Sequence, residues 1–121
     1  MKKILVVDDS SFFRKRIKDL LGKQYEIVEA DCGTAALEQF NKESPIALIL
    51  LDLVMPESDK EGLRVLEEIR KVDRNAPAVI MVTSVKQDQV KAGCEQAGAI
   101  GYVTKPFDEH ELRETVAKLL S

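Results

Sequence analysis

The chain has no tryptophan, one histidine and two cysteines among its 121 residues. Cys32 and Cys94 lack the close spacing of redox or zinc motifs, and no secretion signal precedes them. We therefore expect free thiols in a reducing, cytoplasmic compartment. His110 follows none of the predicted strands, so a serine or cysteine hydrolase triad would have no placed base. His110 is expected to be a surface residue.

Long apolar runs, basic stripes and glycine-rich phosphate loops are also missing. The first apolar run ends at Asp8, too early for a secretion signal, and no run approaches the roughly 18 residues of a membrane span. The net charge is −3 and the Lys and Arg residues are scattered, so we expect no partner that is a nucleic acid or a membrane. Without a GxxxxGK[ST] or GxGxxG loop, a nucleotide cradle is not expected.

What the chain does contain is a regular alternation of short apolar runs and helical patterns. The apolar runs predict strands buried on both faces, and YEIVEA predicts a half-exposed edge strand. Apolar residues spaced three and four apart indicate helices between them, with Gly22 and Gly98 ending the first and fourth helix. The expected strands are Ile4–Val7, Tyr25–Glu29, Ile46–Leu51, Val79–Val82 and Ala99–Val103. The expected helices contain Phe13–Leu21, Ala36–Phe40, Leu63–Ile69, Val90–Ala97 and Leu112–Leu120.

Five strands alternating with five helices predict an α/β fold in one domain, residues 1–121, with a parallel sheet covered by helices on both faces. In such open sheets the working site lies at the carboxyl ends of the strands. Polar residues follow four of the predicted strands: Asp8 and Asp9, then Asp52, then Thr83 and Ser84, then Thr104 and Lys105. We therefore expect three acids, a hydroxyl and a cation to converge at one edge of the sheet.

Such a cluster of acids requires positive charge. Two ionised carboxylates about 4 Å apart repel by roughly 4 kcal/mol at an effective dielectric constant of about 20, so a cation or retained protons must relieve them. An all-oxygen site without nearby His or Cys suits Mg²⁺ better than zinc. A carboxylate beside Mg²⁺ can attack a phosphoryl group and form an acyl phosphate. Mg²⁺, Lys105 and Thr83 would then balance the charge on the phosphoryl oxygens.

Four motifs, in this order and spacing, resemble the receiver domain of two-component response regulators. They are VVDDSSFFRK at Val6–Lys15, LLDLVMP at Leu50–Pro56, PAVIMVTS at Pro77–Ser84 and AGAIGYVTKPF at Ala97–Phe107. The resemblance covers essentially the whole chain. It implies a flavodoxin-like, doubly wound (βα)5 fold with the strand order 2-1-3-4-5. It also implies a phosphorylation-dependent signalling protein, not an enzyme beyond its own phosphorylation and dephosphorylation.

The resemblance also assigns roles at the acidic edge. It implies that Asp52 accepts a phosphoryl group from a histidine kinase or a histidine phosphotransfer protein. Asp8 and Asp9 would hold Mg²⁺ together with Asp52 and the main-chain carbonyl of Val54. For Asp9 or Ser10, a plain helix cap is the alternative.

The same resemblance implies a switch. Thr83 would move to the phosphoryl oxygens, Lys105 would pair with them, and Tyr102 would turn as the aromatic switch residue. The alternative for Tyr102 is a half-buried structural tyrosine. The Lys105–Pro106 peptide bond would be cis, which proline permits.

Aromatic residues near the acidic edge suggest a contact with the partner. Phe12 and Phe13 are adjacent on one predicted helix, and Phe13 fits its apolar stripe. Phe12 is left as a partner contact with Pro106 and Phe107, or as a simple exposed side chain. Because the chain begins with Met1 and ends where the last helix should finish, we expect a stand-alone, chemotaxis-like receiver that is a monomer or a weak dimer.

Two positions depart from the family pattern. The loop Glu57–Gly62 places its glycine two residues late, and Ser58 to Glu61 reads as an S-x-x-E capping box that would start the third helix at Asp59. We interpret the loop as a length variant, with altered partner choice or added negative charge near the metal as the alternative. Val54 and Val85 are apolar and cannot orient a hydrolytic water, so slow self-dephosphorylation is expected.

Two other classes compete. A haloacid-dehalogenase-type phosphatase also uses an aspartate nucleophile at a strand end, but Val54 stands where its second acid would be. A flavodoxin-like redox module lacks support because the chain has no phosphate-binding loop and no tryptophan.

Overall fold

Strands and helices alternate from one end of the chain to the other in the computed structural model, which describes residues 1–121. The strands are β1 (Lys3–Val7), β2 (Glu26–Ala30), β3 (Leu48–Leu51), β4 (Ala78–Thr83) and β5 (Gly101–Thr104). The helices are α1 (Ser11–Leu21), α2 (Gly33–Glu43), α3 (Glu61–Val72), α4 (Asp88–Gln96) and α5 (Glu109–Leu120). None of these helices combines the length and the apolar character that crossing a membrane requires.

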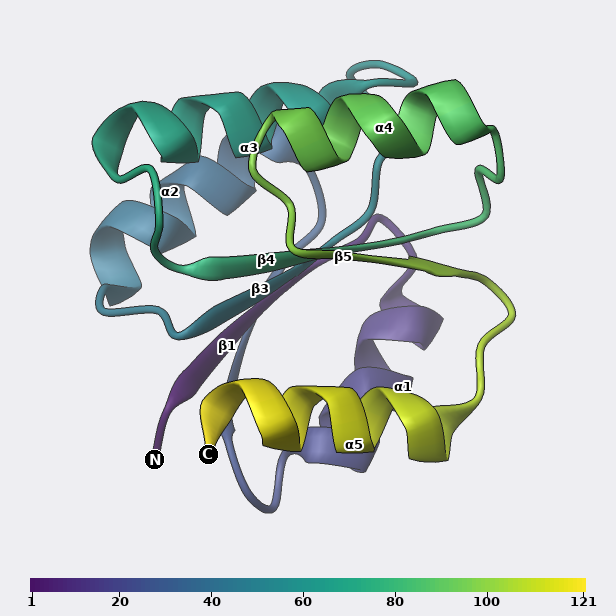
Figure 1. The fold of residues 1–121 in the computed structure, drawn as a ribbon. Coiled ribbons are helices and arrows are strands. Elements are labelled where there is room, and N and C mark those ends of the chain that lie inside the picture. The colour runs from purple at the N-terminus through teal and green to yellow at the C-terminus, as the bar shows by residue number, and fades with distance from the viewer.

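All strand pairs are parallel, and the sheet order is β2-β1-β3-β4-β5. Helices α2, α3 and α4 cover one face, and α1 and α5 cover the other (Figure 1). This confirms the predicted doubly wound fold and the place of β2 at an edge. Because the strands are parallel, their carboxyl ends all meet at one edge of the sheet.

The central strands read as continuous apolar runs because both of their faces are buried. In β1, Leu5 and Val7 pack into the core beneath α2, α3 and α4, whereas Ile4 and Val6 pack into the core beneath α1 and α5. The alternation follows from the two-residue period of a strand. The resulting rigid sheet holds the residues that follow β1 and β3 in place.

Helix α3 begins at Glu61, so the predicted start at Asp59 is wrong. The capping box does not form, because Oγ of Ser58 accepts from the N–H of Lys60 at 2.9 Å instead of capping the helix. Ser58 is held in a tight turn, in which it and Met55 exchange main-chain hydrogen bonds of 3.1 Å. The extra residues of the loop are therefore taken up by this turn and not by an additional helical turn.

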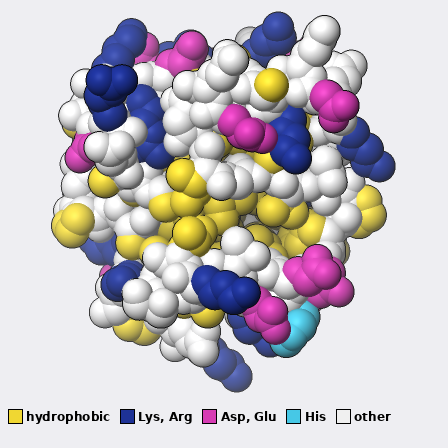
Figure 2. All heavy atoms as spheres, in the orientation of Figure 1, with side chains coloured by type: hydrophobic (Ala, Val, Ile, Leu, Met, Phe, Trp, Pro, Cys, Tyr) yellow, Lys and Arg dark blue, Asp and Glu magenta, His cyan; other side chains and the backbone are white.

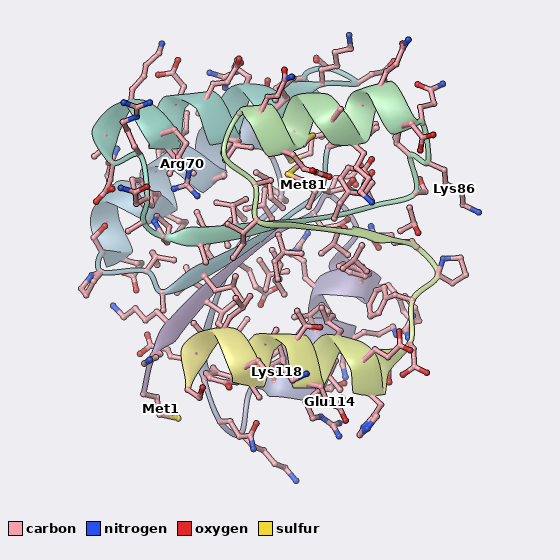
Figure 3. The ribbon with its side chains drawn as sticks, viewed as in Figure 1. Met1, Arg70, Met81, Lys86, Glu114 and Lys118 are labelled. Carbon is pink, nitrogen blue, oxygen red and sulfur yellow. The ribbon has the colours of Figure 1, made fainter.

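Smaller differences concern element ends. Strand β3 begins at Leu48 and β5 begins at Gly101, two residues later than predicted in each case. Gly98 ends α4 with a φ of +112°, as the glycine pattern predicted, whereas Gly22 ends α1 with a right-handed φ of −69°. Arg70 of α3 donates from Nε and Nη2 to the carbonyl oxygen of Gly98 and so ties α3 to the turn after α4 (Figure 3).

Candidate functional site

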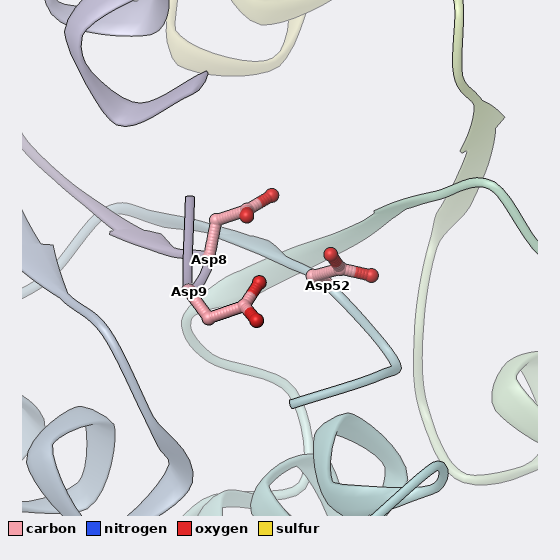
Figure 4. A group of neighbouring side chains, drawn as sticks. All are labelled: Asp8, Asp9 and Asp52. Carbon is pink, nitrogen blue, oxygen red and sulfur yellow. The ribbon is translucent and has the colours of Figure 1, made fainter. Parts of the chain in front are cut away.

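Three carboxylates meet at the carboxyl edge of the sheet. One oxygen each from Asp8, Asp9 and Asp52 lies within 4.8 Å of the others, and the side chains point into a common space (Figure 4). The main-chain N–H of Asp8 donates to Ala30 at the end of β2, and that of Asp52 donates to Val7 at the end of β1. The sheet ladder thus extends one residue past the strands and fixes where the acids start.

Lys105 supplies the positive charge already present in this cluster. Its Nζ lies 2.5 Å from Oδ2 of Asp8 and 3.2 Å from Oδ2 of Asp52. The same Nζ lies 4.0 Å from the ring centroid of Phe13, a cation–π contact that helps to aim the side chain. The peptide bond from Lys105 to Pro106 is cis, as predicted.

Burial sets the electrostatics of the acids. Asp8 is 1% exposed and Asp52 is 8% exposed, whereas Asp9 lies at the surface. Burial raises the pKa of Asp8, against the opposing effect of its hydrogen bonds from Lys105 and from the main chain of Ser10. One lysine cannot balance three carboxylates, so the site has an excess of negative charge.

The donor set fits a hard divalent cation. All three side chains offer oxygen, two of them are buried, and Asp9 lies on the open side. Mg²⁺ prefers one or two carboxylates and keeps several waters, which an open side allows. The main-chain N–H of Val54 points back to Oδ1 of Asp52 at 3.4 Å, so this residue follows the acid in a tight bend.

Thr83 and Tyr102 are linked through one residue, Val85. Thr83 is fully buried at the end of β4, and its Oγ1 accepts from the N–H of Val85 at 3.4 Å. The hydroxyl of half-buried Tyr102 donates to the carbonyl oxygen of Val85 at 2.6 Å. This link is not predictable from the sequence, because a bond between residues 102 and 85 leaves no trace in a periodic pattern.

The aromatic residues divide between core and surface. Phe13 is 8% exposed and packs edge-on against Phe107, with ring centroids 5.8 Å apart. Phe12, the neighbouring residue on α1, is 73% exposed, and Pro106 is also exposed. Oγ of Ser10 accepts from the N–H of Phe13, so Ser10 caps α1 and Asp9 does not. Asp9 is therefore left for the acid cluster.

Two acids after β3 have partners that the sequence did not predict: Glu57 lies in the β3–α3 loop, and Glu61 is the first residue of α3. Glu57 accepts hydrogen bonds from the start of α2, and Glu61 is buried and bonded by Arg64. Gly62 has a clear reason to be glycine, because a Cβ atom there would overlap the carbonyl oxygen of Asp52. The first turn of α3 therefore rests directly on the backbone of the central acid.

A family model described as the response regulator receiver domain matches residues 4–117. The chain belongs to this family. It is 38% identical to the chemotaxis protein CheY of Bacillus subtilis, covering 98% of each chain. It is 36% identical to CheY of Halobacterium salinarum, covering 99% of this chain and 98% of that protein. A solved complex of CheX and CheY with BeF3 and Mg²⁺ from Borrelia burgdorferi matches with a TM-score of 0.86 and 28% identity, over 99% of this chain and 90% of that one.

Membership in this family confirms the predicted fold and class. Receiver domains are phosphorylation-dependent signalling proteins of two-component systems, not enzymes in the usual sense. They bind Mg²⁺ at an acidic aspartate cluster and interact with histidine kinases and phosphotransfer proteins, and this receiver domain has such a cluster. The phosphatase and redox alternatives are therefore set aside.

Proposed function

We propose that this receiver domain, residues 1–121, accepts a phosphoryl group on Asp52. The observation that carries the proposal is the convergence of Asp8, Asp9, Asp52 and Lys105 at one edge of the sheet. Asp8, Asp9, Asp52 and the main-chain carbonyl of Val54 would hold Mg²⁺. When bound, Mg²⁺ neutralises charge on the phosphoryl oxygens.

The chemistry of the transfer is a displacement at phosphorus. A carboxylate oxygen of Asp52 forms a bond to phosphorus while the P–N bond of the donor phosphohistidine breaks, and the imidazole leaves. Asp52 needs no general base because its carboxylate is already the nucleophile. Lys105 lies against Oδ2 of Asp52 and is in reach of the incoming oxygens, so it contributes charge stabilisation. The domain thereby catalyses its own phosphorylation and, with water as acceptor, its own dephosphorylation.

Phosphorylation would change the conformation of Thr83, Val85 and Tyr102. New phosphoryl oxygens attract the Thr83 hydroxyl and draw it away from the N–H of Val85. The carbonyl oxygen of Val85 also accepts the hydrogen bond from the Tyr102 hydroxyl. A shift of Val85 would therefore weaken the bond that holds Tyr102. Phosphorylation in this way biases an existing equilibrium between two conformations of the loop before α4.

The affected surface is the face formed by α4, β5 and α5. All four residues of β5 are half-buried, and apolar side chains gather between α4 and α5 in the middle of this face (Figure 2). A protein target would contact this face. The protein that donates the phosphoryl group would contact Phe12 together with Pro106 and Phe107. Phe107 also packs on Phe13, so it joins the contact surface to the core.

The setting of this function is proposed to be the cytoplasm. Both cysteine thiols are free, as a reducing compartment favours. The net charge of −3 supports protein partners over nucleic acid. We propose a monomer or weak dimer that works through protein contacts.

The phosphoacceptor is tested by mass spectrometry after incubation with acetyl phosphate and Mg²⁺. The parent protein should gain one phosphoryl group, and Asp52→Asn should gain none. Asp59→Asn is the matched control, because it removes a nearby exposed acid that lies outside the cluster. If Asp52→Asn is phosphorylated as fast as the parent, the assignment is wrong.

A further inference from the structure

The first turn of α2 is capped by a residue from another loop. The first N–H groups of a helix have no partner within the helix. Here Oε1 of Glu57 accepts from the N–H of Gly33 and Oε2 accepts from the N–H of Thr34, both at 3.1 Å. We call these two bonds the Glu57 cap. The local cap, Cys32, offers only a sulfur to the N–H of Ala35, so Glu57 satisfies the two donors that Cys32 leaves open.

Glu57 is presented to α2 by a tight turn. Met55 and Ser58 exchange main-chain hydrogen bonds, which puts Pro56 and Glu57 at the tip of the turn. Proline at the first tip position stiffens such a turn. The carboxylate therefore extends from a well-defined loop that departs from the family pattern in length.

A second acid, Glu61 at the start of α3, packs on the same helix start. Glu61 is 4% exposed, and Nε and Nη2 of Arg64 donate to its two oxygens at 2.8 and 2.7 Å. A Cβ atom at Gly33 would overlap Oε2 of Glu61, so only glycine permits this approach. The start of α2 is thus in contact with Glu57 of the β3–α3 loop and with Glu61 at the start of α3.

These contacts connect the two halves of the acidic site. Asp8 donates its main-chain N–H to Ala30 at 3.1 Å, and α2 starts at Gly33, three residues further along the chain. On the other side, Glu57 follows Val54 by three residues. The Glu57 cap therefore closes a path from the segment that carries Asp8 to the segment that carries Val54.

We propose that Glu57 is a positioning residue for divalent-cation binding, which it supports by holding the Val54 segment at a set distance from the Asp8 segment. The inference rests on the proposed Mg²⁺ ligands. Groups that hydrogen-bond directly to metal ligands typically contribute 10- to 100-fold to metal affinity. Glu57 acts one step further out, through the backbone of the two segments, so the lower end of this range is expected.

The test is isothermal titration of the metal-free protein with MgCl₂, without a phosphoryl donor. Glu57→Ala should raise the Kd for Mg²⁺ by about tenfold, the lower end of the effect of lost orienting groups. Glu57→Gln, which keeps one acceptor oxygen, should raise the Kd less. Asp59→Ala is the matched control: it removes a negative charge two residues away in the same loop and should leave the Kd within twofold of the parent value, an estimate that assumes only weak, screened attraction.

The dependence of the Mg²⁺ Kd on salt concentration distinguishes a positioning effect of Glu57 from an effect of its charge. The effect of Glu57→Ala should persist at high ionic strength, whereas a purely electrostatic effect would fade and would be shared by Asp59→Ala. A Kd for folded Glu57→Gln and Glu57→Ala equal to that of the parent would overturn the inference while leaving the proposed Mg²⁺ site intact. A parent protein that does not bind Mg²⁺ would remove the proposed site itself, and the inference with it.

Discussion

We expect individual side chains at the acidic edge to affect how long a phosphoryl group on the proposed acceptor, Asp52, would persist. Val54 follows Asp52 by two residues and is 37% exposed, and half-buried Val85 follows Thr83 by two residues. Neither side chain has a hydrogen-bonding group, so neither can orient a water molecule for attack on the acyl phosphate.

Polar replacements at these two positions should therefore speed hydrolysis. We expect Val54→Asn and Val85→Glu to lose phosphate faster than the parent, because an amide or a carboxylate can position the attacking water. The loss is followed by mass spectrometry after removal of the phosphoryl donor. Unchanged or slower loss in both variants would contradict the expectation.

We expect the free energy of unfolding to depend on pH through the carboxyl group of Glu57. Burial tends to raise the pKa of Glu57, but the hydrogen bonds from Gly33 and Thr34 outweigh this effect and hold the pKa below its ordinary value of 4.5. A carboxyl group whose pKa is lowered in the folded state contributes stability above its unfolded pKa and loses it as the pH falls through the folded value. The stabilisation by the Glu57 cap is thus fully present at neutral pH.

The expected result is a pH-dependent difference between the parent and Glu57→Gln. At pH 7 the parent should have the higher free energy of unfolding, and the difference should narrow once the pH falls below 4.5. Urea unfolding at several pH values measures it. A difference that stays constant down to pH 3 would show that the charge of Glu57 does not contribute.

The helices differ in how firmly they are held. Ser10 caps α1 and Asp108 caps α5 through side-chain oxygens, whereas Gln87 at the start of α4 makes no such bond. Helix α4 also has only one buried residue, Cys94, and contains Gly93 in its interior. Its weak attachment suits an element next to the Thr83–Val85–Tyr102 link, because a loosely held helix needs little energy to shift.

Gly93→Ala should stabilise α4. A Cβ atom at this position would meet no other group, and alanine is about 1 kcal/mol more favourable than glycine inside a helix. Gly62→Ala is the contrasting variant and should destabilise the protein by about 1 to 3 kcal/mol, since its Cβ would overlap the Asp52 carbonyl oxygen. Urea unfolding compares the two. If Gly93→Ala unfolds at a lower urea concentration than the parent, the conclusion that a Cβ atom has open space at this position is wrong.

At the level of the entire protein, we expect the acidic edge to lower the free energy of unfolding of the metal-free fold. One oxygen from each of the three carboxylates lies within 4.8 Å of the others, and one lysine opposes them. Unfolding would separate these charges, so their repulsion favours the unfolded state. A ligand that binds only the folded state reverses this effect.

Mg²⁺ should therefore raise the melting temperature of the parent. At 100 times its Kd the ion would add about 2.7 kcal/mol to the free energy of unfolding, which corresponds to several degrees. Asp9→Asn should melt higher than the parent without Mg²⁺, by about 1 kcal/mol of relieved repulsion in a solvent-exposed setting, and should gain little from added Mg²⁺. Differential scanning calorimetry with EDTA and with Mg²⁺ tests both expectations. Equal responses to Mg²⁺ in the two proteins would exclude Asp9 as a ligand.

The order of the elements and the location of the acids followed from local patterns in the chain. Apolar runs mark buried strands, and the carboxyl ends of parallel strands share an edge, so the sequence alone predicts that Asp8, Asp9 and Asp52 meet. The pairing of Lys105 with two of these acids follows the same rule, because β5 ends at that edge as well. These features depend on a two-residue period and on strand direction, which a sequence records.

Features that depend on contact between distant loops were not predictable in this way. The two bonds of the Glu57 cap span 24 and 23 positions of the sequence, and the bond from Tyr102 to Val85 spans 17 positions. The start of α3 was misplaced for the same reason: the S-x-x-E pattern favoured a local cap, but packing buried Glu61 against Gly33 and paired it with Arg64. A local pattern records what a side chain is able to bind, whereas its actual partner is chosen by which groups the folded backbone brings within hydrogen-bonding distance.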